Sequence, residues 1–270
     1  MPIAIQNARD LAEAASSGRL LATLFPTIDQ WLPQLIASVA WSVRLSSHFV
    51  LLYHCDPSVA TPLDQDAFLT ECEQCRDQLL QYFGVVPSTK AERDALKNHL
   101  TIMIFHVQSK RTFGNLLRPN MLLYLLDTEQ DPDYRTKIRH EMTHWLWGAL
   151  YGEAPSLLNE GVAVVAETLS APGKTEADLF RGLRPLDDVP PLEQLAGNET
   201  FFGAGTGYYR IAGTFVYFLS QRGGWERVAE LFRRTDYDDA AFGESLAQVY
   251  GLSLQEADVE WRSFVRSKTG

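Results

Sequence analysis

The chain has few cysteines and no long apolar run, and both absences exclude classes of protein. Its three cysteines among 270 residues are too few, and odd in number, for a disulfide framework. The most apolar stretch near the N-terminus, WLPQLIASVAWSV, is interrupted by polar residues and a proline. It is shorter than the roughly 20 apolar residues that span a bilayer. The N-terminus also lacks the basic and then apolar order of a secretory signal. We therefore expect a soluble, cytoplasmic protein with no membrane partner.

Positive charge is also scarce. The chain has 24 Lys and Arg against 34 Asp and Glu, which gives a net charge of −10. An acidic chain repels phosphate backbones, so nucleic-acid binding would need a concentrated basic patch. The best candidate, QSKRTFGNLLRP at 108–119, is short and interrupted, and we interpret it as a solvated loop. We expect no nucleic-acid partner, and the sequence leaves the oligomeric state open.

Hydrophobic patterning divides the chain into three parts, 1–45, 46–152 and 153–270. The first part has apolar positions at helix spacing, which predicts an N-terminal helical segment. The second part predicts strands at 48–56, 99–107 and 120–127, and helices at 64–84 and 136–152, the latter with Thr136 as candidate N-cap. The third part predicts a helix from about 158, a long irregular connection over 170–206, and helices to the C-terminus. This order predicts an α+β fold whose second half is helical.

Cys72 and Cys75 form a Cys-x-x-Cys pair, a pattern found in zinc and redox sites. The pair lies inside the helical pattern DAFLTECEQCRDQLLQYFG, and the chain has no second cysteine pair to complete a zinc site. We interpret both residues as ordinary half-buried helical thiols.

The stretch IRHEMTHW at 138–145 carries the clearest chemical signal. Residues four apart project from the same face of a helix, so His140 and His144 can both reach one metal ion. Glu141, beside the first histidine, can accept a proton from an attacking water and pass it to a leaving amine. The alternative is an amphipathic helix that carries two histidines by chance.

A catalytic zinc site needs a third protein ligand and one open position. Glu153, Glu160 and Glu167 follow the motif, and Glu160 is favoured. It stands 160 − 144 = 16 residues after His144, at the first turn of the next helix, where Gly161 leaves room for crowded helices. Glu153 falls in the intervening turn. Glu167 lies on the same helical face as Glu160 and is a candidate hydrogen-bond partner for a ligating histidine.

HEMTH followed by LLNEGVAVVAE resembles the gluzincin metallopeptidases, in particular the peptidase-MA-like bacterial proteins. The resemblance covers about 48–268. It implies a zincin-like α+β fold with a small mixed sheet and an active-site helix, followed by a helical C-terminal half. It further implies one Zn²⁺ ion held by His140, His144 and Glu160, with Glu141 as general base and no other cofactor.

The resemblance also implies an oxyanion donor and shows two departures. In the relatives a tyrosine ahead of a later apolar helix donates to the oxyanion, which points to Tyr209, with Tyr208 as the close alternative. The NMLLYLLDTEQD segment lacks the GxMEN-type stretch of the aminopeptidases, so aminopeptidase action is unsupported. Val164 stands where thermolysin-like relatives carry an aspartate.

Two functions of different classes follow from these residues. The first is a zinc metallopeptidase acting on a peptide or protein, which would pair with the edge of the sheet at 120–127. The second is a catalytically silent zincin-fold binding or regulatory protein. Hydrolysis of a non-peptide amide is a third reading, because it needs the same water-activating groups. The substrate and the choice between endo- and exopeptidase action are left open.

Overall fold

The computed structural model describes residues 39–85, 87, 89–106, 113–118, 120–126, 134–203, 205–237 and 241–269. Their contacts divide into two units, each of which is described by itself. The sheet unit contains the described residues of 1–77 and 96–141, and the helical unit those of 78–95 and 142–270. The division falls inside a helix, between Glu141 and Met142. The three-part division by pattern stays a prediction, because residues 1–38 of its first part lie outside the described ranges.

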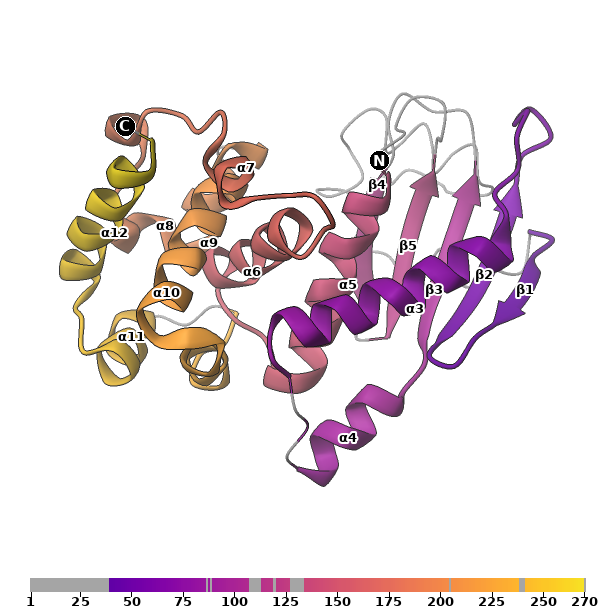
Figure 1. Ribbon diagram of the computed structural model, residues 1–270, viewed down its shortest axis with the longest axis horizontal. Coiled ribbons are helices and arrows are strands. Elements are labelled where there is room, and N and C mark those ends of the chain that lie inside the picture. The colour runs from indigo at the N-terminus through magenta and orange to yellow at the C-terminus, as the bar shows by residue number, and fades with distance from the viewer. Residues whose placement is uncertain are drawn as a thin grey trace, which may run out of the picture. The chain divides into compact units, whose positions relative to one another are not determined.

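Within the described residues the sheet has five strands, in the order β1-β2-β3-β5-β4 (Figure 1). The strands are β1 (Ser42–Leu45), β2 (Phe49–Cys55), β3 (Leu100–His106), β4 (Phe113–Arg118) and β5 (Met121–Leu126). β2, β3 and β5 are parallel, whereas β1 and β4 pair antiparallel with β2 and β5. The three expected strands are confirmed as β2, β3 and β5.

Two strands were not expected, and one of them corrects the expected sheet edge. Residues 42–45 form β1 rather than helix, and part of the expected loop at 108–119 forms β4. Gly114 and Asn115 have low strand propensity, so β4 depends on its pairing with β5 more than on its own sequence. Because β4 pairs with β5, β5 is an interior strand of the described sheet, and the expectation of an edge at 120–127 is wrong.

Helix α3 (Gln65–Tyr82) runs across one face of the sheet (Figure 1). It begins where the Asp64 carboxylate accepts the N–H groups of Asp66 and Ala67, which is an N-cap. The side chains of Phe49, Leu51, Ile102, Ile104 and Leu122, which alternate along their strands, are all buried at 0–1% exposure. The expected helix at 64–84 is therefore confirmed, and its apolar side belongs to the core.

Two more helices complete this half of the chain, α4 (Lys90–Lys97) and α5 (Tyr134–Tyr151). α4 was not expected; its capping box joins Thr89 and Glu92, each side chain bonding the other's backbone N–H. α5 confirms the expected helix at 136–152, but it starts at Tyr134. Thr136 is thus inside the first turn, and its expected role as N-cap is wrong.

The rest of the helical unit consists of helices joined by short turns. They are α6 (Ser156–Leu169), α7 (Glu176–Phe180), η3 (Leu186–Asp188), α8 (Leu192–Leu195), α9 (Asn198–Gly203), η4 (Gly205–Tyr208), α10 (Tyr209–Arg233), α11 (Phe242–Tyr250) and α12 (Leu254–Thr269). α10 contains the two expected helices of this region, which meet at Gly224, where φ is 75°. The described residues thus form a mostly helical α+β protein. No described helix is long and apolar enough to cross a membrane.

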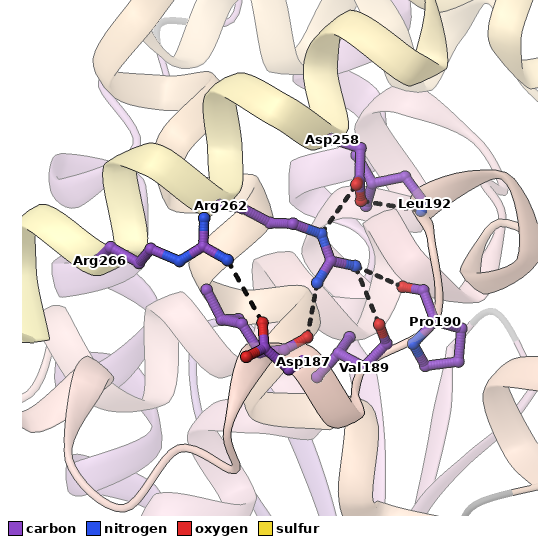
Figure 2. A network of polar contacts seen from close by, with 8 residues as sticks. Asp187, Val189, Pro190, Leu192, Asp258, Arg262 and Arg266 are labelled. Carbon is purple, nitrogen blue, oxygen red and sulfur yellow. Dashed lines mark hydrogen bonds and ion pairs between the residues drawn. The ribbon is translucent and has the colours of Figure 1, made fainter.

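The expected irregular connection at 170–206 is wrong, because short helices occupy much of it. Arginine side chains donate hydrogen bonds to backbone carbonyls of this segment. Arg210 donates to the carbonyls of Asp178 and Arg181 at the end of α7. Arg262 on α12 donates to the carbonyls of Leu186, Val189 and Pro190 (Figure 2).

Candidate metal centre

A stripe of accessible residues runs along the middle of α5, a helix that is otherwise mostly buried. Lys137, His140, Glu141 and His144 are half-buried and Gly148 is exposed, at the three- and four-residue spacing of one helical face. Most of the remaining positions, including both tryptophans, are buried. His140, Glu141 and His144 therefore lie on the open side of the helix, whereas Met142 and Thr143 are buried.

The structure brings His140, His144 and Glu160 together. One ligand-type atom from each lies within 4.8 Å of the others. The His144 Nε2 atom is 3.5 Å from Glu160 Oε2, and the two side chains are 10% and 14% exposed. The histidines share a continuous helix, and Glu160 is in the second turn of α6. The three expected ligands are thus adjacent, partly shielded from water and still reachable.

Asn159 orients one of these histidines. Its Oδ1 atom lies 3.0 Å from His144 Nδ1, so the ring donates its Nδ1 proton to the amide oxygen. The lone pair of Nε2 then faces Glu160, which is the tautomer that a metal ligand requires. Glu167 is the histidine partner that the sequence predicts, and Asn159 is not predicted for this role. Its position directly before the ligand glutamate was the available signal.

The start of α6 is fixed by a side chain from another helix. Pro155 occupies the N-cap position without a side-chain hydrogen bond, and the Ser156 N–H donates to Asn198 Oδ1 at 3.0 Å. Asn198 therefore satisfies one of the N–H groups that the first turn of a helix leaves without a partner. This bond holds the helical turn immediately before Glu160.

Gly161 permits a close approach of α6 to α10. A Cβ atom there would lie 2.5 Å from Val216 Cγ2 and 2.6 Å from the Ala212 carbonyl oxygen. Gly161 is expected to leave room for crowded helices, and the helix that uses this room is α10. Val164, at the position of the relatives' aspartate, packs against Gly213 of α10. A carboxylate at that position would face the apolar contact between the two helices.

Glu141 has a buried tyrosine as its neighbour in the sheet unit. Tyr124 of β5 is fully buried and its hydroxyl donates to the Lys137 carbonyl at 3.4 Å. Burial raises the pKa of Tyr124 well above its usual value, and the negative charge of Glu141 raises it further. Glu141 itself is half-buried, so its carboxylate has both a neutral phenol nearby and access to water.

The other expected site residues are placed as follows. Glu167 is half-buried on α6 and does not belong to the cluster of ligand atoms. The Tyr209 ring is half-buried and stacks on Phe201, with 5.8 Å between centroids and 19° between planes. Tyr208 is buried, with the Arg184 guanidinium 4.9 Å above its ring. The oxyanion role of either tyrosine stays a prediction.

The second motif, Cys72 and Cys75, has a different environment. Both thiols are free, and their residues are 1% and 7% exposed. Burial raises the pKa of Cys72 well above its usual value, and it raises the pKa of Cys75 to about 11. Among the described residues no further ligand-type group joins them in a cluster.

The donor set of the candidate centre fits a metal ion. Two imidazole nitrogens and one carboxylate oxygen are the protein ligands of a catalytic zinc site, which keeps a fourth position open. Compared with models of protein families, the chain matches none, and no curated protein matches it. Inference about function therefore depends on the geometry of these side chains and on the motif itself.

Proposed function

We propose that the chain is a zinc-dependent metallopeptidase of the gluzincin type. The observation that carries this proposal is the cluster of His140, His144 and Glu160, with ligand-type atoms within 4.8 Å. Asn159 supports it, because a hydrogen bond to Nδ1 presents His144 as a neutral imidazole ligand. When bound, zinc supplies a Lewis acid that polarises the scissile carbonyl and favours ionisation of water.

The side chains of the chain itself would then carry out the proton transfers. Glu141 is next to His140 on the open stripe of α5, and it takes the proton of the attacking water. The same carboxylic acid then gives this proton to the leaving nitrogen. Tyr209, or Tyr208 in its place, would donate a hydrogen bond to the oxyanion, which is worth roughly 10²–10³ in rate.

The substrate would be an extended peptide that adds a strand to the sheet. Among the described strands, β4 is at the edge of the sheet on the side of β5 and would pair with the peptide. Gly114 of β4 pairs with Tyr124 of β5, and Tyr124 is the residue whose pKa responds to Glu141. A peptide paired with β4 would therefore lie one strand away from Tyr124, the residue next to the proposed base Glu141. β4, Tyr124 and Glu141 all belong to the sheet unit.

Metal analysis of the purified full-length chain tests the proposal. We expect about one zinc per chain in the wild type and loss of that zinc in Glu160→Gln, which keeps the size of the side chain. Glu153→Gln removes an exposed carboxylate from the preceding turn and serves as the matched control. Equal zinc content in Glu160→Gln and Glu153→Gln, with both variants folded by circular dichroism, would contradict the third ligand.

The silent binding protein is the second outcome of the same experiments. A wild type that holds zinc but cleaves nothing in a broad peptide library would favour it. In that case Glu141→Gln would change neither zinc content nor any measured turnover. Cleavage that disappears in Glu141→Gln with zinc retained favours the peptidase.

A further inference from the structure

A groove in the helical unit shares no residue with the metal centre. Its volume is about 650 Å³, within the range of roughly 300–1,000 Å³ typical of ligand sites. One wall is the turn between α8 and α9, with Glu193 and Ala196. The other wall is formed by the starts of α11 and α12, with Phe242 and Leu254. The groove thus has apolar residues on both walls and opens to solvent.

Hydrogen bonds fix both walls of this groove. The Asn198 side chain accepts the Ser156 N–H through Oδ1 and donates to the Tyr237 carbonyl through Nδ2 at 2.7 Å. The first N–H of α8, at Leu192, donates to Asp258 Oδ1 at 3.1 Å, so α8 is tied to α12 (Figure 2).

Arg262 in turn holds Asp258, through a 2.8 Å bond from its Nε atom (Figure 2). Glu193 follows Leu192 directly, and Leu254 lies one turn before Asp258. The distance between Glu193 and Leu254 is therefore fixed before any ligand binds, which lowers the entropic cost of binding.

The groove is acidic as well as apolar. Glu193 and Glu244 both line it and are exposed. Neither makes an ion pair or a side-chain hydrogen bond with a residue that the structure describes. Tyr237 also lines the groove and is 42% exposed. Two carboxylates that form no ion pair with a described residue, together with an aromatic face, attract a cation, and the net charge of −10 adds to this field.

We propose that this groove binds a peptide segment in which an apolar side chain lies next to a lysine or arginine. The apolar side chain would pack on Ala196 and Leu254, and the basic group would lie between Glu193 and Glu244. An acidic peptide is repelled by the two carboxylates, and a purely apolar peptide leaves them unused. The binding does not depend on the metal centre, so it can be tested separately from hydrolysis.

Fluorescence anisotropy with a labelled peptide of sequence Gly-Leu-Lys-Leu-Arg, in the presence of EDTA to prevent cleavage, tests the proposal. We expect saturable binding to the full chain. The double variant Glu193→Gln/Glu244→Gln should bind roughly 5- to 30-fold more weakly, because two charge contacts at the surface are lost. Ala247→Trp, at an exposed position of the same groove, should weaken binding by occupying it.

The matched control is Asp188→Asn/Glu226→Gln, which removes two exposed carboxylates outside the groove and should bind like the wild type. Absence of saturable binding to the wild type overturns the proposal. Equal weakening by the control pair, or equal binding of the peptide Gly-Leu-Glu-Leu-Glu, also overturns it. Displacement by hexylamine at the same concentration as unlabelled peptide would assign the groove to a small amine and reject the peptide.

Discussion

Two helices of this chain carry a pair of side chains with metal-binding chemistry, and only one pair is placed to use it. His140 and His144 are four residues apart on α5, and Cys72 and Cys75 are three apart on α3. Either spacing puts both side chains on one helical face. The histidines are half-buried and have Glu160 within reach, whereas the cysteines are buried and have no third ligand among the described residues. Spacing alone therefore does not distinguish the two motifs.

The two pairs differ in the free energy needed to bring the side chain into the protonation state that binds a metal. A thiol binds metal as a thiolate, and burial disfavours that charge, as the raised pKa values of both cysteines indicate. An imidazole binds as a neutral group, so partial burial costs it little. The charged member of the candidate centre, Glu160, remains 14% exposed beside His144.

The largest expected effect is on turnover in Glu141→Gln. The amide cannot take a proton from water, so we expect kcat to fall by about 10²–10⁴. Zinc content should stay at the wild-type value, because Glu141 is not a ligand. Initial rates on a cleaved peptide and metal analysis of the same preparation measure both quantities. Undiminished kcat in this variant would remove Glu141 from the mechanism.

The reactivity of the thiols tests whether Cys72 and Cys75 are as inaccessible as their burial indicates. A pKa of about 11 lowers the thiolate fraction of Cys75 at pH 7 by roughly 10² relative to an ordinary thiol. Cys55 is only half-buried. We expect the native chain to react with Ellman's reagent at Cys55 first and to react at all three thiols once unfolded. Cys55→Ser should remove the fast phase; three equally fast thiols in the native chain would show that the α3 pair is accessible.

Zinc affinity should be lower in Asn159→Ala. Loss of the Oδ1 atom removes the hydrogen bond that sets the tautomer of His144, and such losses reduce metal affinity by roughly 10–100-fold. Asn159→Asp keeps an acceptor oxygen and should remain closer to the wild type. Competition with a chelating indicator gives both dissociation constants. If Asn159→Ala binds zinc as tightly as the wild type, the amide has no part in ligand orientation.

The sequence predicted the local part of the site better than the parts that depend on distant contacts. His140, Glu141 and His144 follow from helical periodicity, which four or five residues suffice to show. The role of Asn159 depends on the crossing of α5 and α6, so its position directly before Glu160 is the one signal that the sequence offers. β4 was missed for a related reason, because its pairing with β5 compensates for Gly114 and the adjacent Asn115. The short helices at 176–203 likewise depend on arginines far away in the chain.

Alanine substitutions at two glycines near the candidate centre distinguish the effect of packing on stability from the effect of helix propensity. Gly161→Ala places a Cβ atom 2.6 Å from the Ala212 carbonyl oxygen, so α10 must move. We expect a loss of about 1–3 kcal/mol in the free energy of unfolding. Gly148→Ala, on the exposed stripe of α5, meets nothing within 4 Å and should gain about 0.5–1 kcal/mol. Urea denaturation measures both, and a stabilising Gly161→Ala would show that α6 and α10 are not in close contact.

The smallest expected effect concerns Glu73, which lies between the two cysteines of α3 and has a structural partner. Its carboxylate accepts the His48 backbone N–H at 2.9 Å and lies 2.7 Å from His48 Nδ1. Partial burial acts to raise the pKa of Glu73, but these hydrogen bonds outweigh it and lower the pKa below 4.5.

A carboxyl whose pKa is lower in the folded state stabilises the fold above its unfolded pKa. That contribution is lost as the pH falls through the folded pKa. Glu73→Gln should therefore be less stable than the wild type at pH 6, by about 1 kcal/mol or less because the pair is partly exposed. The difference should shrink below pH 4.5, whereas Glu226→Gln, at an exposed position, should show none at either pH. Urea midpoints of the three chains across this range decide whether α3 uses its polar residues to anchor the sheet, as α5 is proposed to use its own to hold a metal.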